Sequence, residues 1–153
     1  MRPIFITLMV LLSLVLGSVG AFAAEDLKKG PVVQILPFAA PAELKNGARR
    51  TLPVTLFLEL VSEDDADEVC RAYPRIRDAV LGVLSLRPIP VRKSLLNFDG
   101  YPHPLRVAIN RVLPSASIRQ VHIRQGNILI GSGTSTRIGA FQGCARVRDF
   151  HSK

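Results

Sequence analysis

The spacing of apolar residues changes within residues 51 to 88, and this change constrains the fold more than any other feature of the chain. In the first part, apolar residues stand at every second position: Val54, Leu56, Leu58 and Leu60. Side chains of a β-strand alternate between its two faces, so this pattern predicts a strand with one buried face. In the second part, they recur mostly every three or four positions: Val69, Tyr73, Ile76, Val80, Val83 and Leu84. That spacing predicts an amphipathic helix directly after the strand, and therefore an α+β domain.

An acidic turn separates the two patterns. Ser62 is followed by five carboxylates: Glu63, Asp64, Asp65, Asp67 and Glu68. A serine cap and carboxylates in the first turns suit the unpaired N–H groups and the positive dipole end of a helix. A calcium loop would need alternating ligands around a glycine turn, which this segment lacks. We therefore expect helix capping here and no metal site.

Pro74 falls inside the predicted helix. Proline lacks the backbone donor that a helix interior needs, and it disfavours helical angles at the preceding Tyr73. The helix is therefore either kinked near Tyr73 or broken into two pieces, residues 64–72 and 75–86. Because the apolar stripe keeps its phase through the proline, we expect the kinked helix.

Two further strands and a second helix are predicted outside this region. Val32–Leu36 is a short apolar run between two prolines, which predicts a strand followed by a loop from Phe38 to Arg50. Residues 105–113 carry one apolar stripe and predict a helix whose first turn suits Pro102. Residues 118–125 alternate as a half-buried strand.

The other segments are less constrained. Residues 91–98 fit either a short strand or a turn of helix, and residues 127–130 fit a further strand. Residues 131–153 carry several glycines and small polar residues, which predict a flexible basic tail. We therefore expect one domain over residues 32–130, with a small three- to four-stranded sheet and two main helices.

The N-terminus carries a targeting segment. Arg2 precedes an uncharged apolar run, and Ala21-Phe22-Ala23 matches the small-x-small pattern of a signal-peptidase site. The run from Ile4 to Ala24 is also long enough to remain as a membrane anchor. Residues 1–23 are therefore a signal peptide or a membrane anchor, residues 24–31 are a linker, and the remainder is exported in both cases. The Ala-x-Ala pattern favours cleavage after Ala23.

The basic charge of the chain favours an acidic partner. The net charge is +8, and only Asp99 and Asp149 are acidic beyond residue 79. Export and the lack of tryptophan argue against nucleic-acid binding. Anionic lipid headgroups or an acidic protein surface fit the basic half better, and a solvated basic face without a partner fits equally well.

The residues needed for catalysis or metal binding are missing. Cys70 and Cys144 either form a disulfide, which an oxidising compartment permits, or stay unpaired, with Cys70 as a small buried residue. His103, His122 and His151 lack the spacing of zinc ligands, so we expect surface histidines. The Gly131–Ser135 segment lacks the lysine of a phosphate loop. No serine lies in a nucleophile elbow. We expect no cofactor, no metal and no enzyme activity.

Residues 31–125 resemble the periplasmic domain of the flagellar basal-body-associated protein FliL family. The resemblance is carried by the strand Leu56–Leu60, the run Tyr73-Pro74-Arg75-Ile76-Arg77-Asp78-Ala79-Val80 with Leu84-Ser85, the helix Leu105–Leu113 and the strand Ile118–Gln125. The Pro-Arg-Ile-Arg-Asp run is its most specific part. The family pattern ends near Gln125, so the residues beyond depart from it.

This resemblance implies a stomatin-like fold that assembles as a homo-oligomeric ring. It implies a non-enzymatic role at the flagellar basal body, on the periplasmic side of the inner membrane, in support of the stator during motility and chemotaxis. The family usually keeps its N-terminal helix as an anchor. Candidate interaction residues are Arg75, Arg77, Arg106 and Arg111. A solvated helix face explains Arg75 and Arg77 equally well, and a soluble periplasmic accessory or binding module is the alternative function.

Overall fold

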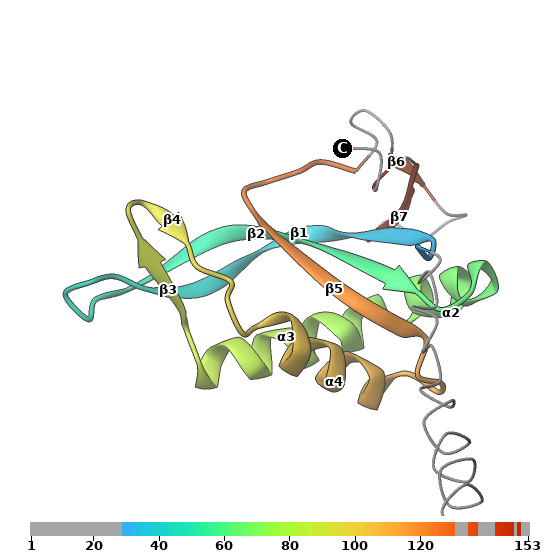
Figure 1. Cartoon of the computed structure of the whole chain (residues 1–153), viewed down its shortest axis with the longest axis horizontal. Helices are drawn as coiled ribbons and strands as arrows, with labels where there is room; N and C mark the ends of the chain where they lie inside the picture. Colours follow the sequence, from blue (N-terminus) through green and yellow to red (C-terminus); the bar gives the residue numbers. More distant parts are fainter. Residues whose placement is uncertain (1–28, 131–134, 138–142, 149, 151–153) are drawn as a thin grey trace, which may run out of the picture.

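Two long antiparallel strands form the centre of the molecule. The computed structural model describes residues 29–130, 135–137, 143–148 and 150. These strands are β1 (Val32–Glu43) and β2 (Arg49–Leu60) (Figure 1). The sheet continues beyond β2 through β5 (Ile118–Gln125) and beyond β1 through β3 (Ile89–Arg92) and β4 (Leu95–Leu96). The strand order is β4-β3-β1-β2-β5, and of these pairs only β1 and β3 are parallel.

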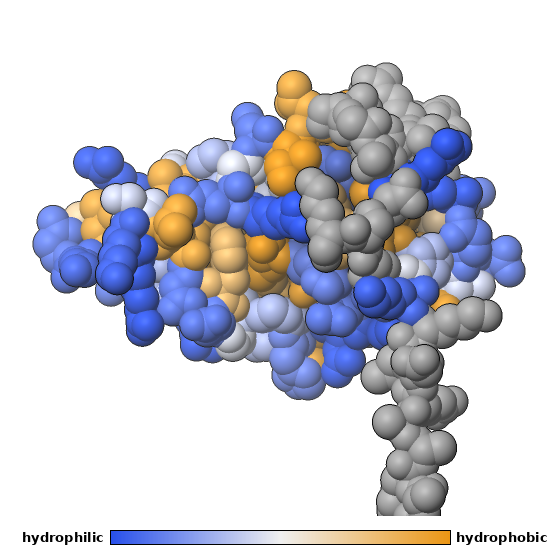
Figure 2. Space-filling model, turned by 45° about the horizontal axis from the view of Figure 1, so that its top comes forward, coloured by the Kyte–Doolittle hydropathy of each residue, from blue (hydrophilic) through white to orange (hydrophobic). Residues whose placement is uncertain are grey.

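Two helices pack side by side on one face of this sheet. They are α3 (Tyr73–Leu86) and α4 (Pro102–Val112), and α4 also packs against β5 (Figure 1). A 3-10 turn, η1 (Glu63–Asp65), and a short helix, α2 (Ala66–Arg71), connect β2 to α3. The predicted α+β class is therefore confirmed. Hydrophilic residues gather at both ends of the long axis, and apolar residues are exposed between them (Figure 2).

The predicted alternation of β2 sets the core. Val54, Leu56, Leu58 and Leu60 are at most 1% exposed and belong to the main apolar cluster. Ile76, Val80 and Leu84 of α3 and Leu105 and Ile109 of α4 complete this cluster from the helix side.

The helix after β2 is broken and not kinked. α2 ends at Arg71 and α3 begins at Tyr73, which places Pro74 in the first turn of a new helix. Proline is tolerated there because the N–H groups of a first turn have no partner within the helix. The predicted cap is confirmed: the Ser62 hydroxyl accepts from the Asp64 N–H at 3.3 Å.

β1 is longer than the sequence predicts. It continues through Pro37 and Pro41 to Glu43, so the expected loop from residue 38 to residue 50 is reduced to residues 44–48. The register with β2 shifts between Ile35 and Phe38, which places Pro37 in a β-bulge. A bulge tolerates a residue without a backbone donor, and this explains why the proline does not end the strand.

The sheet is also larger than the expected three or four strands. Residues 89–96 form the β3–β4 hairpin, and with β6 (Ser135–Arg137) and β7 (Cys144–Val147) the described part of the chain contributes seven strands. β7 pairs with Val32–Ile35 of β1, so the expectation of a flexible tail is wrong for these residues. Residues 127–130, by contrast, do not form the further strand that their apolar character suggests.

A disulfide joins β7 to α2. Cys144 lies beside Ile35 in the sheet and pairs with Cys70, with a Cα–Cα distance of 5.4 Å. The adjacent Gly143 permits this approach, because a Cβ there would lie 2.5 Å from the Tyr73 ring. The pairing that the sequence left open is therefore present in this structure.

No helix within the described part of the chain is both long and apolar enough to cross a bilayer. The N-terminal targeting segment lies outside the described residues, as do His151 and most of Gly131–Ser135.

Candidate functional site

Three of the four candidate arginines are exposed on the helix layer. Arg75 and Arg77 lie in the first half of α3, and Arg111 lies in the last turn of α4. The two helices run in opposite directions, so the start of α3 and the end of α4 lie toward the same end of the molecule (Figure 1). In the described structure none of the three takes part in an ion pair. They therefore present positive charge to solvent.

Arg106, the fourth candidate, does not belong to this exposed group. It is half-buried on α4, and its guanidinium donates to the Arg119 carbonyl oxygen at 3.2 Å. A second guanidinium nitrogen lies 3.4 Å from Nδ1 of His103. Arg106 thus ties α4 to β5 and contributes to a separate feature, a cleft along β5.

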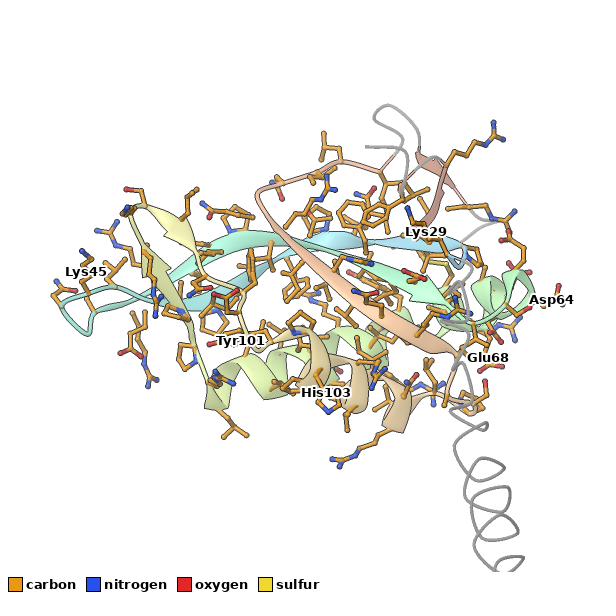
Figure 3. All side chains as sticks on the ribbon, viewed as in Figure 1. Lys29, Lys45, Asp64, Glu68, Tyr101 and His103 are labelled. Atoms are coloured by element: carbon orange, nitrogen blue, oxygen red, sulfur yellow. A yellow bond between two sulfur atoms is a disulfide. The ribbon has the colours of Figure 1, made fainter. Side chains whose placement is uncertain are left out.

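The β5 cleft has a volume of about 530 Å³. Its described lining comes from the start of α4, from β5, from the end of β2 and from the residue that precedes Gly30: Pro102, His103, Arg106, Arg119, Gln120, Val121, His122, Glu59 and Lys29. Lys29 and His103 lie on opposite sides of β5 in Figure 3. The lining contains three cations, two histidines and one carboxylate.

Glu59 is the buried carboxylate of the β5 cleft, at 5% exposure. Its Oε1 accepts from the Gly30 N–H at 2.9 Å and lies 3.7 Å from the Arg119 guanidinium. Its Oε2 lies 3.4 Å from Nε2 of His122. A buried carboxylate is tolerated when charged and hydrogen-bonded partners surround it, as they do here. Glu59 offsets one of the three cations of the lining, which leaves an excess of positive charge at the cleft.

Gly30 fixes the linker against β2. A Cβ at this position would collide with the Leu60 carbonyl oxygen, and the Leu60 N–H donates to the Pro31 carbonyl oxygen at 2.8 Å. Only glycine allows such a close approach of two backbones. This contact carries Lys29 to the rim of the β5 cleft.

The sequence did not reveal the β5 cleft. Alternation along β2 places Glu59 on the face opposite Leu58, where a solvated carboxylate is expected, and His122 was expected at the surface. His122 is instead half-buried against Glu59, and its ring lies 5.0 Å from the ring of Phe150, whereas His103 is exposed as expected. The cleft joins residues from position 29 to position 122, and no local pattern connects them.

The chemistry available at these surfaces is that of charge recognition. Among the residues that the structure describes, no three His, Cys, Asp or Glu side chains form a group able to hold a metal ion. Arginine suits carboxylate and phosphate partners because its guanidinium presents donors in a fixed plane. No protein-family model, curated protein or solved structure matches the chain.

Proposed function

We propose that this protein is a non-enzymatic component of the bacterial flagellar basal body. It acts on the periplasmic side of the inner membrane, where it supports the stator in flagellum-dependent motility and chemotaxis. Two findings support the proposal: the resemblance of residues 31–125 to the FliL family, and the exposure of charged residues within the most specific part of that resemblance.

The exposure of Arg75 and Arg77 carries the proposal. Both lie in the Pro-Arg-Ile-Arg-Asp run, whose one buried residue, Ile76, is 0% exposed and packs into the core. The run therefore needs Ile76 for folding, but it does not need the two arginines for packing. Exposed charges of one sign speed association with a surface of opposite sign and help to select it. A stator or basal-body protein with an acidic periplasmic surface fits this requirement.

The proposal includes a stomatin-like arrangement in which identical domains stand side by side as a ring. Such a ring would surround or support the stator units and would act by position, without any chemical step. Arg111 and the rest of α4 are further candidates for contact with neighbouring proteins.

The test reverses charge with Arg75→Glu/Arg77→Glu in the native bacterium. Folding should be preserved, because exposed substitutions seldom change the free energy of unfolding by more than about 0.5 kcal/mol. Swimming should be impaired, and crosslinks to neighbouring proteins in the membrane should decrease. The matched control, Arg75→Lys/Arg77→Lys, keeps both charges and should swim normally.

Normal swimming and normal crosslinks in the folded reversal variant would reject this face as the functional surface. Normal swimming on soft and on viscous media in a strain without the protein would reject the motility role itself.

The β5 cleft supports a second candidate function, an exported binding module unrelated to motility. Its size and its excess of positive charge suit a small anionic ligand or an acidic peptide. Calorimetric titration of the purified protein with an acidic peptide should then detect binding, and Arg106→Ala should weaken it. A strain without the protein should swim normally.

A further inference from the structure

Two turns meet at one end of the long axis, in a region that we call the basic end. They are the β1–β2 turn and the turn of the β3–β4 hairpin, and the end of α3 lies toward the same side of the molecule (Figure 1). Lys45 stands at the extreme of this end in Figure 3. Six exposed cations come from these turns, from the strands beside them and from the end of α3: Lys45, Arg49, Arg50, Arg87, Arg92 and Lys93.

Positive charge exceeds negative charge at the basic end. Residues 43–52 and 86–100 hold the six cations and two acids, Glu43 and Asp99, which leaves a local charge of +4. Glu43 lies opposite Arg49 in the pairing of β1 with β2, so it acts mainly on that cation. In the described structure none of the six cations takes part in an ion pair. The basic end therefore attracts negative charge from outside the chain.

A hollow between the two turns combines cations with aliphatic side chains. Its volume is about 470 Å³. Its described lining holds no acid, and it includes the cations Lys45, Arg50 and Lys93 and the aliphatic residues Leu44, Leu52 and Val91. A lining of this kind suits a ligand that joins an anionic group to a hydrocarbon part.

The hairpin turn keeps a lysine at a position that favours other residues. Lys93 and Ser94 have φ angles of 50° and 67°, and they connect Arg92 and Leu95, which pair across the hairpin. Both angles are left-handed, as in a type I′ turn, where asparagine and glycine are favoured. Lysine therefore weakens the turn, and a contact of its side chain with a partner explains its presence.

Two large apolar side chains protrude beside these cations. Leu95, directly after the turn, is 64% exposed, and Leu86, the last residue of α3, is 91% exposed. Figure 2 shows apolar residues among hydrophilic ones at this end. Binding to a membrane surface gains from exactly these two contributions, burial of apolar area and attraction of cations to anionic lipids.

A bilayer fits the basic end better than a protein surface does. A stable protein interface takes about 800 Å² of complementary surface from each partner. The cations and leucines of the basic end instead lie on two turns and a helix end. A fluid bilayer closes around such protruding segments and needs no matching shape.

We propose that the basic end docks on an anionic lipid surface, with a headgroup phosphate in the hollow beside Lys93 and with Leu95 among the acyl chains. The inference rests on the location at the membrane that the proposed function includes. The described chain begins at the opposite end of β1, whose 12 residues cover roughly 40 Å at about 3.3 Å per residue. If the leader is retained, docking therefore lays the domain along the membrane.

The experiment uses the chain from Ala24 to Lys153, the form that cleavage after Ala23 releases, so that the leader cannot insert into vesicles. Co-sedimentation compares vesicles that contain about 30% anionic lipid with vesicles of zwitterionic lipid alone, at about 100 mM salt. The chain should bind the anionic vesicles only. Raising the salt to about 500 mM should weaken this binding, because salt screens the attraction.

Charge reversal tests whether the basic end makes the contact. Arg50→Glu/Lys93→Glu should weaken vesicle binding by at least about tenfold, because two attractive charges become repulsive. The matched control, Arg75→Glu/Arg77→Glu, makes the same change of charge in the first half of α3 and should bind within about threefold of the native chain. Circular dichroism melts establish that each variant is folded.

Two leucines of equal exposure separate apolar insertion from charge. Leu95→Ala should weaken vesicle binding by at least about threefold, because less apolar area enters the bilayer. Leu129→Ala, at a residue that is also 64% exposed but lies outside the basic end, should bind like the native chain. Lys45→Glu/Arg92→Glu reverses two charges without changing the residues of the hairpin turn, and it should repeat the loss if Lys93→Glu disturbs that turn.

Equal binding to anionic and zwitterionic vesicles would overturn the proposal, and so would an absence of binding or an equal loss in Arg50→Glu/Lys93→Glu and in Arg75→Glu/Arg77→Glu. Unchanged vesicle binding in the basic-end variant, together with lost crosslinks to membrane proteins, would show that this end faces an acidic protein and would also overturn it. Normal swimming in a strain without the protein rejects the proposed function alone, because vesicle binding is measured independently of motility.

Discussion

One face of the sheet packs against α3 and α4 through aliphatic side chains, whereas the segment after β5 forms hydrogen bonds with buried polar side chains of the opposite face. On the helix face, Leu56 and Leu58 are buried among other apolar residues. On the opposite face, the buried residues include Gln34 and Thr55. The Gln34 amide donates to the Ile128 carbonyl oxygen at 2.5 Å, and the Thr55 hydroxyl donates to the Gly126 carbonyl oxygen at 2.8 Å.

The difference between the two faces lies in how each is specified. Burial on the helix face follows from repeated apolar residues in the two elements that meet, so each element favours the contact by itself. Burial on the opposite face requires each polar group to find one particular partner. That partner lies about 70 to 95 residues away, at Gly126 and Ile128. We expect apolar packing on the helix face to contribute most of the stability. The opposite face should depend on the disulfide and on individual hydrogen bonds.

The largest expected effect is on the helix face. Leu58→Ala should lower the free energy of unfolding by about 2–5 kcal/mol, because Leu58 is 0% exposed and its removal leaves a cavity. Leu86→Ala, at a leucine that is 91% exposed, is the matched control and should change it by less than about 0.5 kcal/mol. Urea titration measures both. A loss below about 1 kcal/mol for Leu58→Ala would contradict the dominance of this face.

The disulfide between α2 and β7 should have the second largest effect on the free energy of unfolding. Cys70→Ala/Cys144→Ala should lower the free energy of unfolding by about 2–4 kcal/mol, since the disulfide closes a loop with a sequence separation of 74. The measurement compares urea titrations of both proteins with and without reductant. Reductant should destabilise the native protein and leave the variant unchanged. Equal stability of native protein and variant under oxidising conditions would show that the disulfide contributes nothing.

A smaller effect is expected for a single hydrogen-bonded group on the polar face. Thr55→Val keeps the shape of the side chain and leaves the Gly126 carbonyl and the Ile128 N–H without their hydroxyl partner. The free energy of unfolding should fall by about 1–3 kcal/mol. Thr51→Val, at an exposed position of the same strand, should be neutral or slightly stabilising. Hydrogen exchange at the Ile128 amide should quicken only in Thr55→Val.

The smallest expected change in the free energy of unfolding comes from the Tyr101 hydroxyl, which belongs to the apolar core. Tyr101 is 2% exposed and donates to the Pro88 carbonyl oxygen at 2.8 Å. Burial raises the pKa of the Tyr101 hydroxyl above its usual value of 10.0, and the nearby Arg87 offsets part of this rise. Above about pH 10, the unfolded chain therefore releases this proton while the folded chain retains it. The free energy of unfolding should fall as the pH rises through this window.

Tyr101→Phe isolates this contribution, because phenylalanine keeps the ring and removes the titrating group. The stability difference between the native protein and the variant should be smaller at about pH 10.5 than at about pH 8. Lysine titration is common to both proteins and cancels in the difference. An unchanged difference would mean that the Tyr101 pKa is the same in the folded and unfolded chains.

The sequence by itself determined the parts of the fold that local patterns encode. Alternation in β2 and β5, the apolar stripes of α3 and α4, and the Ser62 cap all agree with the structure. Each depends on residues within a few positions of one another, because strand and helix periods and caps are set by neighbouring residues. The exposed Arg75, Arg77 and Arg111 follow from the same helical period.

The tertiary structure decided the rest. It extended β1 through Pro37, divided the helix at Ala72, added β7 to the sheet and buried Glu59 beside His122. It also turned Arg106 from the exposed helix face into the β5 cleft. These outcomes depend on a bulge, on Cys144 meeting Cys70, and on backbone groups that find partners far along the chain. No local period can encode them, because the free energy that fixes each one arises only when the distant segments meet.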